Sequence, residues 1–267
     1  MRVLSLNVWG GTLHDELLDY LKAVDADAYC LQEVSRSHGS RSEWLTYRDG
    51  DVELNQRADL FGELRAALPG HDGYFCPTAR GELHDGQGLQ PQEFGLATFV
   101  RSTVPVIGSA LEFVHGAFSP HSFGDHPRSR NAHAIRVFDY PTGKTLTVVQ
   151  LHGLREEDGK SDSPTRDAQT DALVALIGRV AHPEDALVVC GDLNVLPDSR
   201  LFSTLGRLGL VDLVTTRGFT DTRTSHYRKG NRFADYLLVS TGTPVADFQV
   251  VEQPEVSDHR PLLLTVT

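Results

Sequence analysis

The chain has 267 residues, 40% of them hydrophobic and 23% charged, which is the composition of an ordinary globular protein with a sizeable core. Its formal net charge of −11 argues against the basic surface that gives proteins non-specific affinity for nucleic acid, so no stable duplex binding is expected. Its three cysteines stand far apart without a Cys-x-x-Cys pair, which argues against a disulfide framework and against a zinc cluster.

The chain opens with MRVLSLNVWG, which is typical of a strand and lacks the apolar segment of a signal peptide. Its apolar runs stay well short of the ~18 residues that a membrane-spanning helix needs. We therefore expect a cytoplasmic, monomeric protein without a transmembrane segment. The sequence shows no linker, repeat or low-complexity tract, so a single domain over residues 1–267 is expected.

The first 34 residues show a strand–helix–strand pattern. Residues 2–8 are predicted to form a strand, and residues 28–34 a second one. Between them, leucines and a valine over residues 13–24 recur at helical spacing. Thr12 and Asp15 resemble a capping box at the start of this helix.

The middle of the chain is dominated by predicted strands. Residues 35–57 are polar and show no clear pattern, residues 58–68 form an amphipathic helix, and residues 79–93 are expected to be a mobile loop. A turn at residues 141–144 suggests a hairpin within an antiparallel meander. The strands predicted in this part cover residues 73–77, 94–101, 106–113, 132–140 and 145–152.

The last hundred residues return to alternating helices and strands. Ser163 and Pro164 form a typical helix start, residues 187–190 form a buried strand, and residues 197–206 form a short helix. Many strands with few helices between them indicate stacked sheets with helices outside. The remaining predicted strands cover residues 219–224, 234–240, 246–251 and 261–266.

Polar residues interrupt several apolar stretches at the point where strands end. Any one of them is equally consistent with a turn or a cap. Together they form a set rich in oxygen ligands with two imidazoles, which suits Mg²⁺, Mn²⁺ or Ca²⁺ better than zinc and leaves the histidines for proton transfer. The set consists of Asn7, Glu33, His152, Asp192, Asn194, Asp235, Asp258 and His259.

These residues lie in the motifs SLNVWG, LQEV, QLHG, GDLN, ADYLLVS and SDHRPL. Their order and spacing resemble the endonuclease/exonuclease/phosphatase superfamily, the DNase I-like metal-dependent phosphoesterases. The resemblance covers residues 3 to about 266. It implies an α/β fold in which two mixed β-sheets pack face to face as a four-layer sandwich with helices on the outside. It also implies hydrolysis of a phosphodiester by in-line attack of an activated water.

The resemblance implies a metal site and a catalytic group. Glu33 resembles the principal ligand of Mg²⁺ or Mn²⁺, with Ca²⁺ as an alternative, and Asn7 and Asp258 would lie beside it. Asp192 would orient the attacking water, and Asn194 would hold a phosphate oxygen.

The two histidines complete the implied catalytic group. His259 would be the base or a phosphate ligand, and Asp235 would fix its tautomer. His152 would contact the phosphate or protonate the leaving group.

Basic residues near these motifs are candidate substrate contacts. Residues 115–131 are expected to form a flexible loop over the site. Arg223 is the best single candidate for a phosphate clamp because a guanidinium offers a bidentate fork, with a surface salt bridge as the equal alternative. Arg166 and Gln169 are expected to pin the loop after His152. The candidate substrate contacts are Arg128, Arg130, Asn131, Arg223 and Tyr227.

The substrate class is narrowed by charge and by one motif. QLHG departs from the Tyr-containing motif of the apurinic-site branch and resembles the DNase I and sphingomyelinase branches. We therefore expect a small or single-stranded phosphodiester substrate, such as a nucleotide, an oligonucleotide or a lipid headgroup. The alternatives are a phosphomonoesterase of the same superfamily and a non-catalytic binding module.

Overall fold

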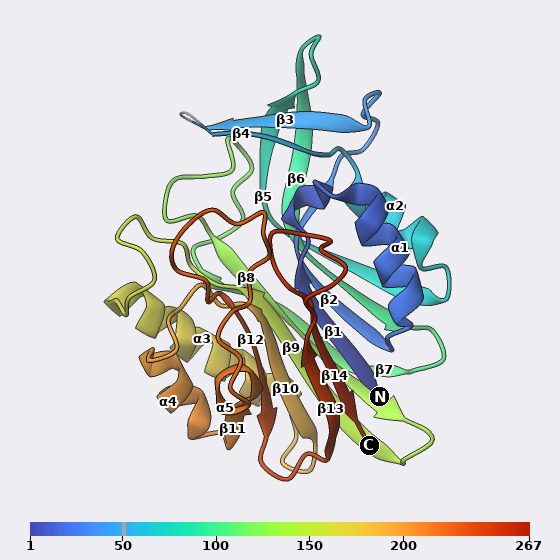
Figure 1. Cartoon of the computed structure of the whole chain (residues 1–267), viewed down its shortest axis with the longest axis vertical. Coiled ribbons are helices and arrows are strands. Elements are labelled where there is room, and N and C mark those ends of the chain that lie inside the picture. The colour runs from blue at the N-terminus through green and yellow to red at the C-terminus, as the bar shows by residue number, and fades with distance from the viewer. Residues whose placement is uncertain (50–51) are drawn as a thin grey trace.

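The computed structural model describes residues 1–49 and 52–267, and in it two β-sheets pack face to face (Figure 1). The six-stranded sheet consists, in spatial order, of β11 (Leu210–Asp212), β12 (Asp235–Ser240), β10 (Ala186–Asp192), β9 (Lys144–His152), β8 (Arg130–Asp139) and β7 (Val106–His115). The eight-stranded sheet consists of β13 (Val245–Val250), β14 (Leu262–Val266), β1 (Arg2–Asn7), β2 (Ala28–Arg36), β6 (Leu89–Arg101), β5 (His71–His84), β3 (Trp44–Asp49) and β4 (Val52–Arg57).

Helices cover the outer face of each sheet, so the molecule has four layers (Figure 1). The eight-stranded sheet carries α1 (His14–Val24) and α2 (Leu60–Ala67), with the short 3₁₀ helix η1 (Trp9–Gly11) before α1. The six-stranded sheet carries α3 (Pro164–Val180), α4 (Arg200–Gly206) and α5 (Leu213–Thr216). This arrangement confirms the expected α/β four-layer sandwich. No helix within the described residues is long and apolar enough to cross a membrane.

Each sheet contains one parallel pair at its centre, which makes both sheets mixed. β1 runs parallel to β2, and β9 runs parallel to β10, while the other pairs are antiparallel. The carboxyl ends of a parallel pair lie at the same edge of their sheet. Polar residues that end these four strands are therefore brought together, as in many α/β proteins.

The helix starts illustrate which local signals are reliable. Ser163 caps α3 by accepting a hydrogen bond from the Arg166 amide, as the sequence predicts. The helix predicted from residue 197 begins at Arg200, and Ser199 caps it by accepting a hydrogen bond from the Leu201 amide. The predicted capping box before α1 is wrong. The Thr12 hydroxyl donates to the Trp9 carbonyl at 2.7 Å, because residues 9–11 form a 3₁₀ turn ahead of the helix.

The predicted mobile loop at residues 79–93 is also wrong. This segment is the projecting hairpin of β5 and β6, visible at the top of Figure 1. One face of it carries the buried residues Ala79 and Leu83, which cluster with Leu45 and with Phe123. The exposed face is polar and glycine-rich, and this hides the alternation in the sequence.

Two other segments differ from their prediction. The polar region before α2 forms β3 and β4, which pair with each other as a hairpin. Residues 219–224 form no regular strand and contribute only an isolated bridge between Arg223 and His259. That bridge fixes the segment beside the candidate site rather than within a sheet.

Candidate active site

Register places three of the polar residues side by side at one edge of the six-stranded sheet. His152 and Asp192 end neighbouring parallel strands, and they are direct partners in the β9–β10 register. Asp235 begins β12 and is the direct antiparallel partner of Asp192. Three residues that are far apart in the sequence are thereby fixed as neighbours by backbone pairing alone.

Irregularities of the backbone determine the direction of the side chains at the site. Glu33 has a φ of 58° and lies where the β2–β6 register shifts, so a bulge turns its carboxylate out of the strand alternation. Gly191 has a φ of 137°, and a Cβ there would lie 2.0 Å from the Leu151 carbonyl oxygen. Only glycine permits β9 and β10 to approach this closely just before His152 and Asp192.

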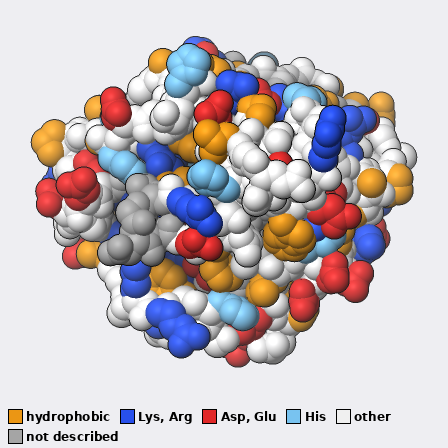
Figure 2. Space-filling model, turned by 90° about the horizontal axis from the view of Figure 1, so that it is seen from above, with side chains coloured by type: hydrophobic (Ala, Val, Ile, Leu, Met, Phe, Trp, Pro, Cys, Tyr) orange, Lys and Arg blue, Asp and Glu red, His pale blue; other side chains and the backbone are white. Residues whose placement is uncertain are grey.

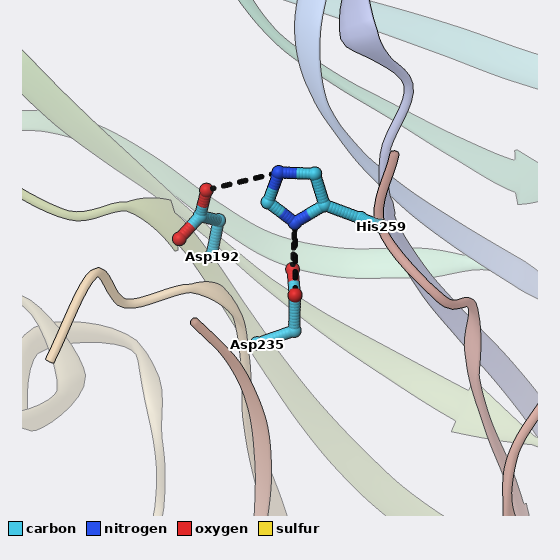
Figure 3. A group of neighbouring side chains, drawn as sticks. All are labelled: Asp192, Asp235 and His259. Atoms are coloured by element: carbon cyan, nitrogen blue, oxygen red, sulfur yellow. Dashed lines mark hydrogen bonds and ion pairs between the residues drawn. The ribbon is translucent and has the colours of Figure 1, made fainter. Parts of the chain in front are cut away.

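His259 lies between two carboxylates, as Figure 3 shows. Its Nδ1 is 2.8 and 2.9 Å from the two carboxylate oxygens of Asp235, and its Nε2 is 3.6 Å from Oδ2 of Asp192. All three side chains are at least 95% buried. Because Asp235 can only accept, it orients the ring with a proton on Nδ1 and leaves Nε2 facing Asp192.

Electrostatics favour charged forms in this group. Burial alone would lower the pKa of His259, but the carboxylates of Asp235 and Asp258 outweigh it and raise that pKa to about 9. Burial alone would raise the pKa of Asp192, but His259 and His152 hold it below its ordinary value. An imidazolium beside a carboxylate is therefore the favoured pair in the absence of a bound ion.

Asn7 joins the two sheets at the site. Its Nδ2 donates to Oδ2 of Asp192 at 3.1 Å, and its Oδ1 accepts the Trp9 amide at 3.0 Å. The Ser257 hydroxyl donates to the Asn7 carbonyl at 2.7 Å and accepts the His259 amide at 3.2 Å. One serine thus ties the end of β1 to the segment that carries His259.

His152 approaches the same group from β9. Its Nε2 is 3.7 Å from Oδ2 of Asp192 and 3.9 Å from Oε1 of Glu33, which is too long for direct hydrogen bonds. Burial, with a contribution from nearby Arg130, lowers the pKa of His152 to about 3. The ring is therefore neutral and can either donate to or accept from a ligand that enters between the two carboxylates.

Arg223 belongs to the site rather than to the surface. Its side chain is 6% exposed, and its NH1 donates to Oδ2 of Asp258 at 2.9 Å while also contacting Nε2 of His259. Its guanidinium lies 4.2 Å from the ring centroid of Tyr227, a cation–π contact. The alternative of a surface salt bridge is therefore wrong.

The donor atoms fit a hard cation. Oδ1 of Asp258 is buried and has no hydrogen-bond partner among the described residues. The Glu33 carboxylate, a quarter exposed, and the Asn7 amide oxygen add further oxygen donors of the kind that Mg²⁺ or Mn²⁺ takes. Asp192, Asp235 and His259 also lie within ion-binding distance of one another. Asp235 and His259 are already joined to each other by hydrogen bonds, whereas Oδ1 of Asp258 accepts none from the described residues.

The loop of residues 116–129 is anchored rather than flexible. The Arg80 amide donates to the Ser119 carbonyl at 2.7 Å, and the Phe123 amide donates to the Arg80 carbonyl at 3.0 Å. Gly81 allows this because any Cβ there would lie 2.2 Å from the Phe123 ring. The expected flexible loop is corrected accordingly.

The basic residues around this loop divide into two groups. Arg130 is 92% buried and faces Glu33 and His152 from the start of β8. Arg128 donates to the Tyr47 hydroxyl at 2.7 Å at the edge of the same space. Asn131 instead donates to the Cys76 and Pro77 carbonyls at 3.1 and 3.2 Å, which makes it a packing residue between the sheets and corrects its expected substrate contact.

Asn194 and the loop after His152 are held by α3. Asn194 has a φ of 53°, and its backbone amide donates to Oδ1 of Asp192 at 3.1 Å. Arg166 donates to the Asn194 carbonyl at 2.8 Å and to the Gly159 carbonyl, in the loop after His152, at 2.7 Å, and Gln169 accepts the Leu154 amide at 2.9 Å. Both α3 residues thus pin the loop, as the sequence predicts.

Sequence reasoning missed several residues at the site. Ser257 stands beside Asp258 in the same motif, which was a usable signal. Thr222 caps the amides of Ala234 and Asp235 at 3.2 Å, and Lys160 donates to the Phe233 carbonyl beside them. These contacts join segments distant in sequence, so no local pattern marks them.

Comparison with known proteins finds one family model and several solved structures that are similar to this chain. The model of the Endonuclease/Exonuclease/phosphatase family matches residues 4–259. An endonuclease/exonuclease/phosphatase structure from Bacteroides vulgatus is 20% identical with a TM-score of 0.70, covering 100% of this chain and 98% of that chain. The catalytic domain of human nocturnin with bound sulfate is 19% identical with a TM-score of 0.65, covering 100% and 93%.

A mannosyl-6-phosphatase from Bacteroides thetaiotaomicron is 15% identical with a TM-score of 0.68, covering 100% of this chain and 99% of that chain. At these identities the likeness to solved structures shows the fold alone. None of the curated proteins is significantly similar in sequence.

Proposed function

The chain belongs to the endonuclease/exonuclease/phosphatase family, whose members hydrolyse phosphoesters, and we propose on this premise that it is a divalent-metal-dependent phosphodiesterase. One observation carries the proposal. Residues from both sheets converge on a single buried group in which His259, oriented by Asp235, faces Asp192 at 3.6 Å. We also propose that residues 1–267 act as a single catalytic domain.

The catalytic roles that we propose for the individual residues follow from their hydrogen bonds. Asp192 orients the attacking water, because Asn7 and the Asn194 amide hold its carboxylate in one position. His259 takes or supplies a proton at Nε2, since Asp235 occupies Nδ1. His152 contacts the phosphate or protonates the leaving group. The reaction is an in-line displacement at phosphorus that depends on this fixed geometry.

Two carboxylates and one amide would hold the metal ion. Glu33 and Asp258 would offer carboxylate oxygens, and Asn7 would offer its amide oxygen directly or through water. A bound Mg²⁺ or Mn²⁺, with Ca²⁺ as the alternative, would neutralise charge that develops on the phosphate. Asn194, Arg223 and Tyr227 complete the proposed phosphate contacts.

The expected substrate is small or single-stranded. Over the face seen from above, Lys and Arg side chains are interspersed with Asp and Glu side chains (Figure 2). With a net charge of −11, this distribution gives little support for binding the regular phosphate array of a duplex. A compact phosphodiester needs only the local charges of the site.

Hydrolysis of bis(p-nitrophenyl) phosphate tests the proposal. With Mg²⁺ or Mn²⁺ the wild-type chain should release nitrophenolate, while Asp192→Asn and His259→Ala should lose at least about 10²-fold in rate. Asp171→Asn, on the exposed face of α3, is the matched charge control and should keep full activity. Full activity in either site variant contradicts the assigned roles.

The same assay separates the alternatives. A larger kcat/KM on p-nitrophenyl phosphate than on the diester would favour a phosphomonoesterase. Absence of hydrolysis with every metal, together with specific binding of a phosphoester, would favour a binding module.

A further inference from the structure

A small cavity, lined in part by Glu33 and His152, lies beside the proposed phosphate position. Its volume is about 100 Å³. The anchored loop of residues 116–129 and the hairpin of β5 and β6 form its walls, with Phe94 and Phe123 among the lining residues. Complete ligand sites measure about 300–1,000 Å³. The cavity can therefore hold one substituent of a substrate but not a whole one.

The lining of this cavity is strongly basic. It includes Arg130 and Arg155, and also Arg128 and His126, which have interaction partners of their own; among the described lining residues the one carboxylate is that of Glu33. In a chain with 36 acidic and 25 basic residues, such a local excess runs against the overall charge. A basic cavity in an acidic protein indicates selection for an anionic group.

Arg130 supplies the donors. Its side chain is held in place because Nε donates to the Gly153 carbonyl at 2.9 Å. Its two terminal nitrogens have no hydrogen-bond partner among the described residues, although the residue is 92% buried. Burial lowers the pKa of Arg130 only to about 10, so the guanidinium stays charged at neutral pH. A buried guanidinium with free donors is suited to a bidentate oxyanion.

Arg155 adds a second cation at the mouth. It is exposed, it lies three residues after His152, and no ion pair holds it among the described residues. Its side chain can therefore turn toward a bound anion without breaking an existing contact. The rigid backbone pairing of the loop with β5 keeps the opposite wall in place.

We propose that this cavity binds a second anionic group of the substrate, so that the natural substrate is a phosphoester with a further phosphate or carboxylate. The proposal rests on the proposed function, because it takes the scissile phosphate to lie between His152 and His259. It narrows the substrate class to small molecules with at least two anionic groups. Neutral alcohol substituents would leave the Arg130 donors unpaired.

Three probe ligands test the cavity directly. Propyl phosphate has one anionic group, 1,3-propanediol bisphosphate has two phosphates, and the phosphate ester of 4-hydroxybutyrate has a phosphate and a carboxylate. Their inhibition constants are measured against bis(p-nitrophenyl) phosphate hydrolysis. At least one of the two probes with a second anionic group should inhibit about tenfold or more tightly than propyl phosphate. The stronger of the two identifies the second group.

Variants of the cavity arginines test whether the cavity causes the tighter inhibition by probes with two anionic groups. Arg130→Gln and Arg155→Gln should reduce the preference, and Arg155→Gln, at an exposed position, should fold normally. Arg207→Gln, at an exposed position that directly follows α4, makes the same charge change and should keep the preference. A loss in only one cavity variant assigns the group to that arginine. Equal inhibition by all probes, or a preference kept in both cavity variants, overturns the proposal.

A binding measurement separates this result from the proposed function. Thermal shifts with the three probes are recorded in chelator without metal, where no turnover is needed. Larger stabilisation by a probe with two anionic groups, lost in the cavity variants, supports the cavity even if the chain hydrolyses no diester. Diester hydrolysis with equal shifts for all probes leaves the function in place and refutes the cavity.

Discussion

His259 is the residue in which burial and charge act most strongly against each other. Its side chain is 4% exposed, which disfavours the imidazolium, yet three carboxylates lie within 3.6 Å of its ring nitrogens. The balance depends on Asp235, because that carboxylate alone makes hydrogen bonds at normal length. Asp235 is thus a positioning residue that acts through His259.

Replacing Asp235 with Asn tests this role. The amide has nearly the same shape, but it can present its NH₂ group to Nδ1 and so favour the wrong tautomer. We expect kcat for bis(p-nitrophenyl) phosphate to fall about 10²- to 10⁴-fold with a smaller change in KM. Circular dichroism should show an unchanged fold, and Asp247→Asn on the exposed face of β13 serves as control. Wild-type kcat in Asp235→Asn would contradict the role.

The success of site prediction depended on where each residue stands in the chain. Asn7, His152 and Asp192 each interrupt an apolar strand at its end, and pairing of the strands brings them together. Asn131 also stands at a strand start, but its amide turns toward the opposite sheet. Arg155 lies in an irregular charged loop, where no periodicity indicates the direction of a side chain. Sequence thus predicted residues that end an apolar strand or belong to a compact motif, as Asp258 and His259 do, and missed Arg155, which neither feature marks.

At the level of elements, the loop of residues 116–129 acts as a wall of the site. Phe123 packs over Gly81 and joins Leu45 and Leu83 in a small apolar cluster. This cluster is separate from the two main cores, so the loop depends on few contacts. Loss of one large side chain there should release the loop locally rather than unfold the chain.

Phe123→Ala tests the anchoring. We expect a loss of about 3 kcal/mol of local stability, because the variant leaves a cavity under the loop. Hydrogen exchange should accelerate strongly at the Arg80 amide, which donates to the Ser119 carbonyl, and at the Ser119 amide, which donates to the Thr78 carbonyl. Phe118→Ala is the matched control in the same loop, because Phe118 is 42% exposed and should change exchange little. Equal protection in both variants would show that Phe123 does not anchor the loop.

The helices and strands were predicted correctly where apolar residues recur at a clear helical or strand spacing. The helix α3 and the strands β8 to β10 follow clear apolar patterns with marked ends. The hairpin of β5 and β6 was missed because its outer half carries Gly, Gln and charged residues that suggest a loop. Its partners are β3 and the distant Phe123, so tertiary packing rather than local propensity determines it.

At the scale of the whole molecule, the two sheets are joined by a polar network as well as by apolar packing. Gln32 of β2 donates to Gln150 of β9 at 2.9 Å, and Gln150 donates to Thr98 of β6 at 2.7 Å. The Thr98 hydroxyl lies 2.7 Å from Nδ1 of His133 in β8, whose Nε2 is 3.0 Å from the Ser109 hydroxyl. The chain of contacts crosses the interface three times, which fixes the register of one sheet on the other.

This network makes stability depend on pH through His133, which is 3% exposed. Burial lowers the pKa of His133 from 6.5 to about 4, so the unfolded chain binds a proton in this range that the folded chain excludes. The stabilisation is therefore complete above pH 6.5 and is lost as the pH falls toward 4, by about 3 kcal/mol in total. His133→Gln keeps polar atoms in the network but does not titrate, so its free energy of unfolding should be lower by about 1–2 kcal/mol at pH 7. The gap to wild type should narrow as the pH falls and reverse at about pH 5, because the loss in wild type then exceeds the difference at pH 7, while His152, present in both proteins, contributes equally. Urea unfolding at intervals from pH 7 to 4.5 measures both curves, and parallel curves would show that His133 is not excluded from protonation by the fold.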